Sequence, residues 1–201
     1  MYQFKKKIVL ITGGSRGIGK AIAESFALHG AHVVITYKKE KDKAEELIAS
    51  LPGKKHICIQ SDVTIDGEAK AVITKVICKF GALDIVINNA GMYINHPIAK
   101  IAFKEWQAAW STTLETNLIG PANICYYAAK YMMSVKRGKI INISSRGANR
   151  GEPNAPAYGA SKAGINAMSQ SLAIALAPHN VFVGVVAPGF VETDMAASSL
   201  K

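Results

Sequence analysis

Short runs of consecutive apolar residues alternate with longer segments along the chain. The runs are rich in Val and Ile and cover residues 7–12, 32–37, 56–60, 84–88, 139–144 and 181–187. Their apolar residues are continuous rather than alternating, which is typical of strands covered on both faces. The runs therefore predict a parallel sheet.

The segments between these runs have apolar residues at helical spacing. Examples are Ile18, Ile22 and Phe26 in one segment and Val72, Val76 and Phe80 in another. Six strand-helix repeats predict an α/β fold with a doubly wound parallel sheet. We expect a single domain over residues 1–201, because the chain has the length of one ordinary domain and contains no repeat or linker.

The longest irregular connection is predicted at residues 92–107, directly after a strand. In an open α/β sheet, ligands bind beyond the carboxyl ends of the strands. This segment is thus a candidate pocket wall, and a plain connecting loop is the alternative.

The chain is basic, with 24 Lys and Arg against 14 Asp and Glu and a formal charge of +10. Its lysine clusters at 5–7, 38–43 and 136–139 lack the interleaved aromatic residues of a nucleic-acid stacking platform. We expect a solvated basic surface that attracts anionic ligands, including an acidic carrier protein, and no nucleic-acid partner.

Cysteine and histidine spacing predicts neither a disulfide nor a metal site, because the three cysteines and five histidines show no paired ligand spacing. Reduced thiols favour a cytoplasmic protein. The apolar run at 8–11 is too short for a signal peptide, and no apolar stretch is long enough to span a membrane. Of the histidines, His96 is the one that could approach a substrate. Trp106 and Trp110, four residues apart, are expected to pack in a helix core.

The glycine-rich stretch ITGGSRGIGKA at residues 11–21 lies between a strand and a helix, so it is a candidate phosphate-binding turn. As a P-loop, it places Ala21 where a Ser or Thr hydroxyl must bind magnesium, and this argues against a nucleoside triphosphate. As a dinucleotide turn, it presents Gly13, Gly17 and Gly19 at a helix N-terminus that can bind a pyrophosphate.

Four motifs occur in a fixed order: TGGSRGIG at 12–19, NNAG at 88–91, YGASK at 158–162 and PGFVET at 188–193. Together they resemble the classical short-chain dehydrogenase/reductase family, in particular its 3-oxoacyl-[acyl-carrier-protein] reductase branch. The resemblance implies a Rossmann-like fold, a nicotinamide cofactor and carbonyl/alcohol chemistry.

Tyr158 and Lys162 are spaced i,i+4, which places both side chains on one helix face. An adjacent ammonium is expected to lower the pKa of the Tyr158 phenol and make it a usable general acid and base. The resemblance implies that Tyr158 protonates a carbonyl oxygen and that Lys162 holds the nicotinamide ribose. The alternative is an ordinary surface pair.

Ser145 and Asn117 complete the candidate catalytic set. Ser145 follows a strand, where its hydroxyl can bind the substrate oxygen or simply cap a loop. Asn117 lies in a helical segment, where Asn can divert a backbone hydrogen bond. The resemblance implies that Asn117 positions a water in a proton relay with Lys162, and an exposed helix residue is the alternative.

The second strand indicates which dinucleotide is bound. Tyr37 occupies the position at which NAD enzymes carry an acidic residue, and Lys38 and Arg16 can attract a 2'-phosphate. We therefore expect NADP(H). The cofactor-binding residues implied by the resemblance are Gly13, Ser15, Arg16, Gly17, Ile18, Gly19, Tyr37, Lys38, Asp62, Val63, Asn89, Ala90, Gly91, Tyr158, Lys162, Pro188, Gly189, Val191 and Thr193.

Members of the family usually continue beyond the PGFVET motif with a lid segment and a seventh strand. The resemblance thus implies that this chain is a fragment, an unusually short member, or a sequence without a disordered tail. In each case residues 181–187 are expected to form an uncovered apolar edge.

The expected function is reduction of a ketone or 3-oxoacyl thioester to a secondary alcohol with NADPH. The alternatives are a non-catalytic NADP-binding sensor, an alcohol or sugar dehydrogenase working in the oxidative direction, and the disfavoured P-loop nucleotidase. By the resemblance, the partners are a small-molecule or acyl-thioester substrate and further copies of the chain. Segments 117–133 and 158–177 would form a homodimer or homotetramer, without membrane attachment.

Overall fold

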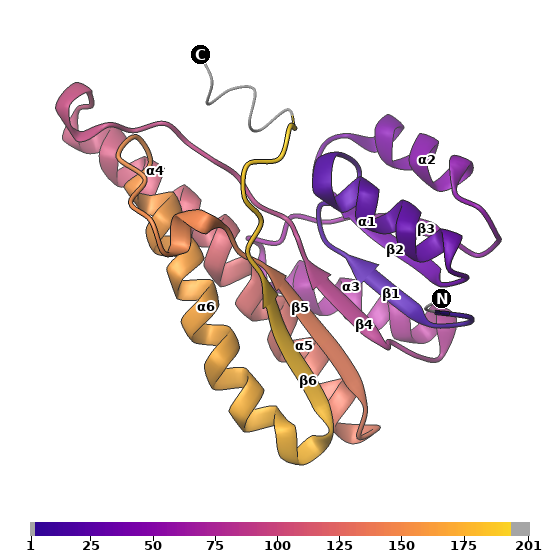
Figure 1. The fold of residues 1–201 in the computed structure, drawn as a ribbon. Helices are drawn as coiled ribbons and strands as arrows, with labels where there is room; N and C mark the ends of the chain where they lie inside the picture. Colours follow the sequence, from indigo (N-terminus) through magenta and orange to yellow (C-terminus); the bar gives the residue numbers. More distant parts are fainter. Residues whose placement is uncertain (1–2, 194–201) are drawn as a thin grey trace.

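The computed structural model describes residues 3–193 and contains one six-stranded parallel sheet (Figure 1). Its strand order is β3-β2-β1-β4-β5-β6. The strands are β1 (Ile8–Ile11), β2 (His32–Tyr37), β3 (Ile57–Gln60), β4 (Ile85–Asn88), β5 (Gly138–Ile143) and β6 (Val181–Val186). Each lies within two residues of a predicted apolar run, so the doubly wound parallel sheet is confirmed.

Helices connect the strands and cover the sheet. They are α1 (Gly17–Leu28), α2 (Lys41–Ser50), α3 (Asp66–Phe80), α4 (Phe103–Leu114), α5 (Gly120–Ser134) and α6 (Pro156–Leu176). A π-helical turn, η2 (Glu115–Ile119), joins α4 to α5. Short 3-10 turns occupy Ile98–Lys100, Arg146–Ala148 and Ala177–His179. Helix α4 begins at Phe103, so the irregular connection predicted at 92–107 is shorter than expected.

Alternate residues of the strands supply two separate cores. On one face, side chains such as Leu10 and Ile140 pack with residues of α3, α5 and α6, including Val76 and Met132. On the other face, strand residues such as Val9 and Val33 pack with residues of α1 and α2. The chain runs from β1 outward to β2 and β3, and then crosses to β4 on the other side of β1. This reversal of direction leaves a crevice above the carboxyl ends of β1 and β4.

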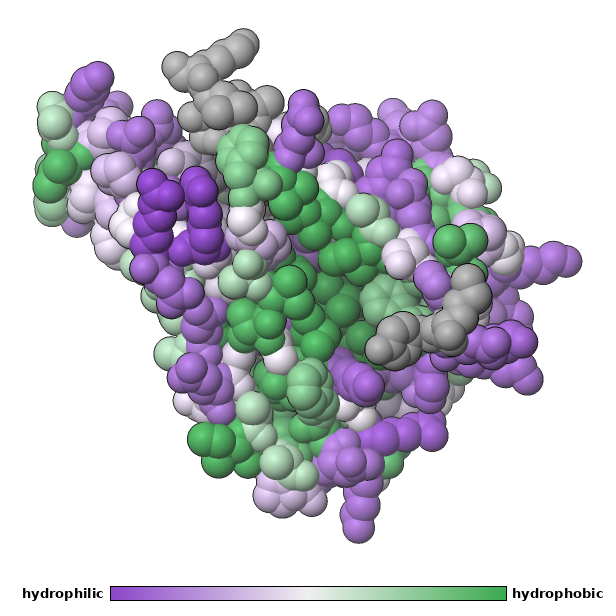
Figure 2. All heavy atoms as spheres, viewed as in Figure 1, coloured by the Kyte–Doolittle hydropathy of each residue, from purple (hydrophilic) through white to green (hydrophobic). Residues whose placement is uncertain are grey.

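The outer part of the α1 face carries exposed apolar side chains. In register, Phe182 and Val186 of β6 pair with Lys139 and Ile143 of β5. Phe182 is 56% exposed and Val186 is 51% exposed. Figure 2 shows hydrophobic residues gathered across the middle of this face, over the edge strand β6. The expected apolar edge is therefore present within the described residues.

Candidate active site

A cleft of about 760 Å³ opens above the carboxyl ends of the strands. Such a volume suits a cofactor together with a small substrate. Its lining includes nearly all the site residues predicted from the sequence: Gly13, Ser15, Arg16, Gly17, Ile18, Tyr37, Lys38, Asp62, Val63, Asn89, Ala90, Gly91, Ser145, Tyr158, Lys162, Pro188, Gly189, Val191 and Thr193. Gly19 and Asn117 are not among the lining residues. Both are buried behind the cleft.

The turn between β1 and α1 has the backbone geometry of an anion cradle. Gly13 and Gly17 have φ angles of +62° and +53°, which side-chain-bearing residues rarely adopt. Arg16 is the N-cap residue of α1, and its side chain makes no capping hydrogen bond to the helix. The first backbone N–H groups of α1 and the positive end of its dipole suit a phosphate group.

Gly19 has a packing function rather than a lining one. A Cβ atom at Gly19 would lie 2.5 Å from the side-chain nitrogen of Asn89 and 2.5 Å from the carbonyl oxygen of Gly13. The Asn89 amide uses that space to donate hydrogen bonds to the carbonyls of Thr12 (3.0 Å) and Gly13 (2.9 Å). Asn89 therefore fastens the end of β4 to the glycine turn.

Thr12 makes the reciprocal connection. Its hydroxyl oxygen accepts hydrogen bonds from the backbone N–H groups of Asn89 (3.1 Å) and Ala90 (3.0 Å). These hydrogen bonds join the ends of β1 and β4, so residues of the TGGSRGIG and NNAG motifs line the cleft side by side.

The end of the cleft at β2 and β3 contains an ion pair and a buried hydroxyl group without a hydrogen-bond partner among the described residues. Lys38 forms an ion pair with Asp62. Burial raises the pKa of the Asp62 carboxyl, but hydrogen bonds from Lys38 and Thr64 outweigh it and bring the pKa below its ordinary value. The Ser61 hydroxyl is buried and has no hydrogen-bond partner among the described residues. An orphaned hydroxyl at this place fits a ligand such as the adenosine end of a dinucleotide.

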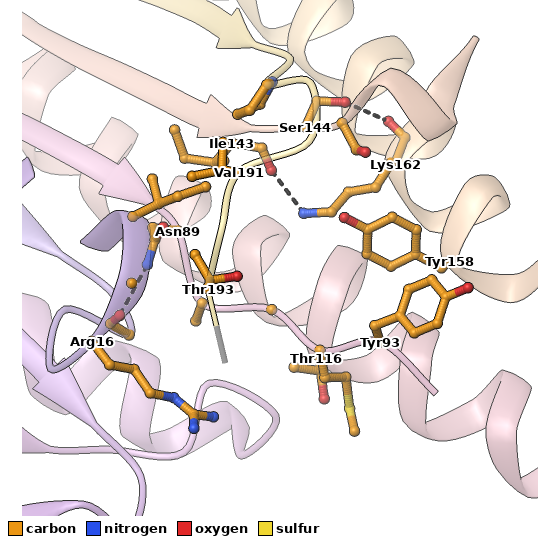
Figure 3. Close-up of a pocket in the computed structure, with 18 of the residues that line it drawn as sticks. Arg16, Asn89, Tyr93, Thr116, Ile143, Ser144, Tyr158, Lys162, Val191 and Thr193 are labelled. Carbon is orange, nitrogen blue, oxygen red and sulfur yellow. Dashed lines mark hydrogen bonds between the residues drawn. The ribbon is translucent and has the colours of Figure 1, made fainter. Parts of the chain in front are cut away.

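Ser145, Tyr158 and Lys162 converge at the other end of the cleft, beside the carboxyl end of β5. Tyr158 and Lys162 come from α6, and Figure 3 shows the Tyr158 ring between the Lys162 side chain and Tyr93. The Lys162 ammonium lies 5.8 Å from the centre of the Tyr158 ring and donates a hydrogen bond to the Ile143 carbonyl at 2.8 Å. Arg16 lies across the cleft (Figure 3).

The pKa of Tyr158 shifts in the direction opposite to the sequence expectation. Burial raises it above the ordinary value of 10.0, a hydrogen bond with Ser145 lowers it, and the Glu152 carboxylate raises it further. The net shift is upward. Burial also lowers the pKa of the neighbouring Lys162 ammonium, to about 8. The phenol is thus held in its protonated form through the neutral range.

Asn117 lies in the π-helical turn η2 and is fully buried. Its side-chain oxygen accepts a hydrogen bond from the Met92 N–H at 2.8 Å, and its side-chain nitrogen donates to the Met92 carbonyl at 2.9 Å. The same nitrogen lies 3.2 Å from the Ser161 hydroxyl of α6. Asn117 thus ties the segment after β4 to the helix that carries Tyr158.

Met92 and Tyr93 line the cleft and belong to the segment 92–107 that was expected as a pocket wall. The lining residues that were not predicted from the sequence are Thr36, Lys39, Glu40, Ser61, Thr116, Ile143, Ser144, Arg146, Glu152, Pro153, Asn154 and Phe190. Tyr93 lies edge-on to Tyr158, with ring centres 5.2 Å apart. Burial raises the pKa of Tyr93, as do Glu152 and Tyr158. Tyr93 lies two residues after the NNAG motif and within the expected pocket wall, so the sequence indicated its place in the cleft.

His96 does not reach the cleft, contrary to the sequence expectation. It is 0% exposed and its ring lies 5.3 Å from that of Trp106. Trp106 also packs against Trp110, with ring centres 5.9 Å apart, as expected for helix packing. The described residues contain no cluster of three or more His, Cys, Asp or Glu able to hold a metal ion. None of the described helices is long and apolar enough to cross a membrane.

Two curated relatives of this chain are 3-oxoacyl-[acyl-carrier-protein] reductases. The 3-oxoacyl-[acyl-carrier-protein] reductase FabG of Staphylococcus aureus strain Mu50 is 37% identical over 191 residues, which cover 94% of this chain and 76% of that protein. The FabG protein of Chlamydia muridarum is 36% identical over 192 residues, with 94% and 75% covered.

A solved structure from Sinorhizobium meliloti 1021, described as a putative short-chain alcohol dehydrogenase, superposes with a TM-score of 0.90 and 33% identity. It covers 98% of this chain, which spans 77% of that structure. The family described as short chain dehydrogenase matches residues 7–201. The shared fold, the matched motifs and this coverage establish that the chain belongs to the short-chain dehydrogenase family of oxidoreductases and is similar to its FabG reductases.

Proposed function

We propose that the protein is an NADPH-dependent reductase that converts a ketone or a 3-oxoacyl thioester into a secondary alcohol. The observation that carries this proposal is the convergence of Ser145, Tyr158 and Lys162 in the same cleft as a glycine turn at a helix N-terminus. One end of the cleft suits phosphate groups, and the other offers a phenol, a hydroxyl and an amine to a carbonyl group.

In this proposal the reduced nicotinamide, when bound, supplies a hydride to the carbonyl carbon. Tyr158 donates its phenolic proton to the carbonyl oxygen. Ser145 donates a hydrogen bond to the same oxygen and stabilises its developing charge. Lys162 holds the ribose hydroxyls of the cofactor.

Asn117 is proposed to act from behind the cleft wall. A Cβ atom at Gly91 would lie 3.4 Å from the Asn117 side-chain oxygen and 3.7 Å from the Lys162 ammonium, so the two groups flank the same glycine. This proximity supports the proton relay implied by the resemblance. Its water is a prediction.

The choice of NADPH over NADH rests on charge. Lys38 and Arg16 line the end of the cleft at which β2 stops, and Lys39 adds a third positive charge. Asp62 lies beside them but is paired with Lys38. Glu40 also lines this end, so three positive side chains stand against two negative ones. A 2'-phosphate would meet an excess of one positive charge here, which favours NADPH.

Substitution Tyr158→Phe tests the proposed function. We expect turnover of a 3-oxoacyl thioester or ketone with NADPH to fall by about 10²- to 10⁴-fold, because the proton donor is lost. NADPH binding, followed by fluorescence, is expected to persist. The matched control is Tyr126→Phe, since Tyr126 is a tyrosine of α5 that is 60% exposed and does not line the cleft.

The alternatives give different results in the same assay. A non-catalytic sensor binds NADPH but shows no turnover with any carbonyl in the wild-type protein. A dehydrogenase that works mainly in the oxidative direction reduces NADP⁺ with an alcohol faster than it oxidises NADPH. Equal turnover in wild type and Tyr158→Phe would contradict the assigned proton transfer.

We also propose that the enzyme is a homodimer or homotetramer. Tyr126 of α5 and Ile174 of α6 are 60% and 79% exposed, on two helices that cover the same face of the sheet. Exposed apolar residues on long helices favour association through these surfaces. Light scattering coupled to gel filtration measures the number of copies, and a monomer at all concentrations would contradict the proposal.

A further inference from the structure

The N-terminus of α6 lacks a cap from its own sequence. Its N-cap residue is Ala155, which has no side-chain acceptor, and Pro156 at the first helical position has no N–H group. The N–H groups of Tyr158 and Gly159 bond to the Ala155 carbonyl, at 2.9 and 3.4 Å. The N–H of Ala157, a residue that is 0% exposed, needs a partner from elsewhere.

His96 supplies that partner from a segment 61 residues earlier in the chain. The Ala157 N–H donates a hydrogen bond to His96 Nε2 at 3.2 Å. His96 Nδ1 lies 2.8 Å from the Ile94 carbonyl oxygen. Because an N–H can only donate and a carbonyl can only accept, Nε2 carries the lone pair and Nδ1 carries the proton. Both ring nitrogens are therefore committed to backbone groups.

The backbone of the same segment is fastened as well. The His96 N–H donates to the Asn154 carbonyl at 2.7 Å, two residues before α6 begins. At the other end of the segment, Met92 is held by both atoms of the Asn117 amide. Tyr93, which contacts the Tyr158 ring, lies between these two attachments. Figure 1 shows α4 and the beginning of α6 close together at this corner of the molecule.

We propose that His96 is a positioning residue for the reaction: it caps α6 in place of a local side chain and thereby fixes Tyr158 and Tyr93 against each other in the cleft. It does not touch the reacting atoms, since it is fully buried away from the cleft lining. The proposal rests on the proposed function for its kinetic consequence, whereas the capping contact itself stands without it.

Three substitutions at His96 separate capping from simple filling of space. In His96→Gln, the side-chain oxygen reaches the place of Nε2 and can accept from Ala157. In His96→Asn, the shorter amide can replace the Nδ1 donor toward Ile94 but cannot reach Ala157. His96→Ala removes both contacts.

The structure also offers a matched control in His56. Its Nδ1 accepts a hydrogen bond from the Val33 N–H at 3.1 Å, and its Nε2 lies 3.0 Å from the Pro52 carbonyl. These contacts lie where β2 and β3 begin, at the opposite end of the strands from the cleft. His56→Ala thus removes a histidine with the same two kinds of backbone contact. Any loss of stability that it shares with His96→Ala is not specific to the site.

The first measurement does not depend on activity. Amide hydrogen exchange of residues 157–159 is expected to become at least about tenfold faster in His96→Ala and His96→Asn, and to stay near the wild-type rate in His96→Gln. Unchanged exchange in both Ala and Asn variants would overturn the capping assignment. If His96→Ala does not fold, the Asn and Gln variants decide the question.

The second measurement is the kinetic one, with NADPH and a carbonyl substrate that the wild-type protein turns over. Misplacement of Tyr158 is expected to lower kcat about 10- to 100-fold in His96→Asn, with the Kd for NADPH unchanged and kcat restored in His96→Gln. His56→Ala is expected to keep the wild-type kcat. Equal kcat in the Asn and Gln variants, or a matching loss in His56→Ala, would overturn the positioning role.

The two measurements also separate this proposal from the proposed function. Wild-type protein without turnover, but with exchange that follows the predicted order of variants, would contradict the reductase and leave the cap confirmed. Normal turnover in the wild-type protein, with amide exchange that is the same in the His96 variants as in wild type, would support the reductase and contradict the cap.

Discussion

The two ends of the cleft are built by different means. The glycine turn and the end of β4 are neighbours in the sheet, and they are held by backbone conformation and by the short side chains of Thr12 and Asn89. The catalytic end is assembled from β5, α6, the π-helical turn and the segment after β4, and the buried side chains of Asn117 and His96 connect these elements. The first end is thus sensitive to added volume, and the second is sensitive to lost side-chain contacts.

Gly19→Ala is the strongest test of the first end. The added Cβ would displace the Asn89 amide, and we expect the free energy of unfolding to fall by about 1 to 3 kcal/mol. Distortion of the turn should weaken NADPH binding about tenfold. Urea unfolding and fluorescence titration measure the two effects.

The control for this substitution is Gly67→Ala. Gly67 lies in α3, and a Cβ atom added there would have no neighbouring atom within 4 Å, so the change should be neutral or stabilise by about 0.5 to 1 kcal/mol. A Gly19→Ala protein that unfolds and binds NADPH like the wild type would remove the proposed volume limit.

Lys162 tests the second end through pH. Burial lowers the pKa of its ammonium from 10.5 to about 8, so above pH 8 the unfolded chain binds more protons at this site than the folded chain. Stability then rises with pH. We expect the wild-type free energy of unfolding, measured relative to Lys162→Met, to increase by about 2 kcal/mol between pH 7.5 and 9.5.

Subtracting the Lys162→Met values removes the contributions of other titrating groups. The increase should level off above pH 10.5, where both states are neutral at this site. If the free energy of unfolding relative to Lys162→Met stays constant or falls over this pH range, burial does not lower the pKa of the Lys162 ammonium.

Lys38→Ala gives the smallest expected effect. The Lys38 side chain is 58% exposed and forms an ion pair with Asp62. Its contribution to 2'-phosphate binding should therefore be about 1 kcal/mol or less. NADPH affinity is expected to fall up to about fivefold at low salt, with NADH affinity unchanged. Lys41→Ala, an exposed pair partner of Glu45 on α2, is the matched control. Equal losses for both cofactors would contradict a phosphate-specific role.

The sequence predicted most of the fold because local patterns carried the required information. Unbroken runs of apolar residues, such as that of β1, are typical of strands covered on both faces, and the segments between them have apolar residues at helical spacing. The glycine turn was also readable, since Gly13 and Gly17 adopt backbone angles that other residues avoid. These features depend on residues that are close in the chain.

What the tertiary structure alone decided depends on residues far apart in the chain. The upward shift in the pKa of Tyr158 comes first from burial and also from Glu152, and neither could be weighed from the i,i+4 spacing with Lys162. The engagement of Asn117 with Met92 and of His96 with Ala157 follows from how α4, η2 and α6 pack at one corner. Sequence spacing specifies which groups share an element, whereas burial and contacts between elements determine what those groups can do.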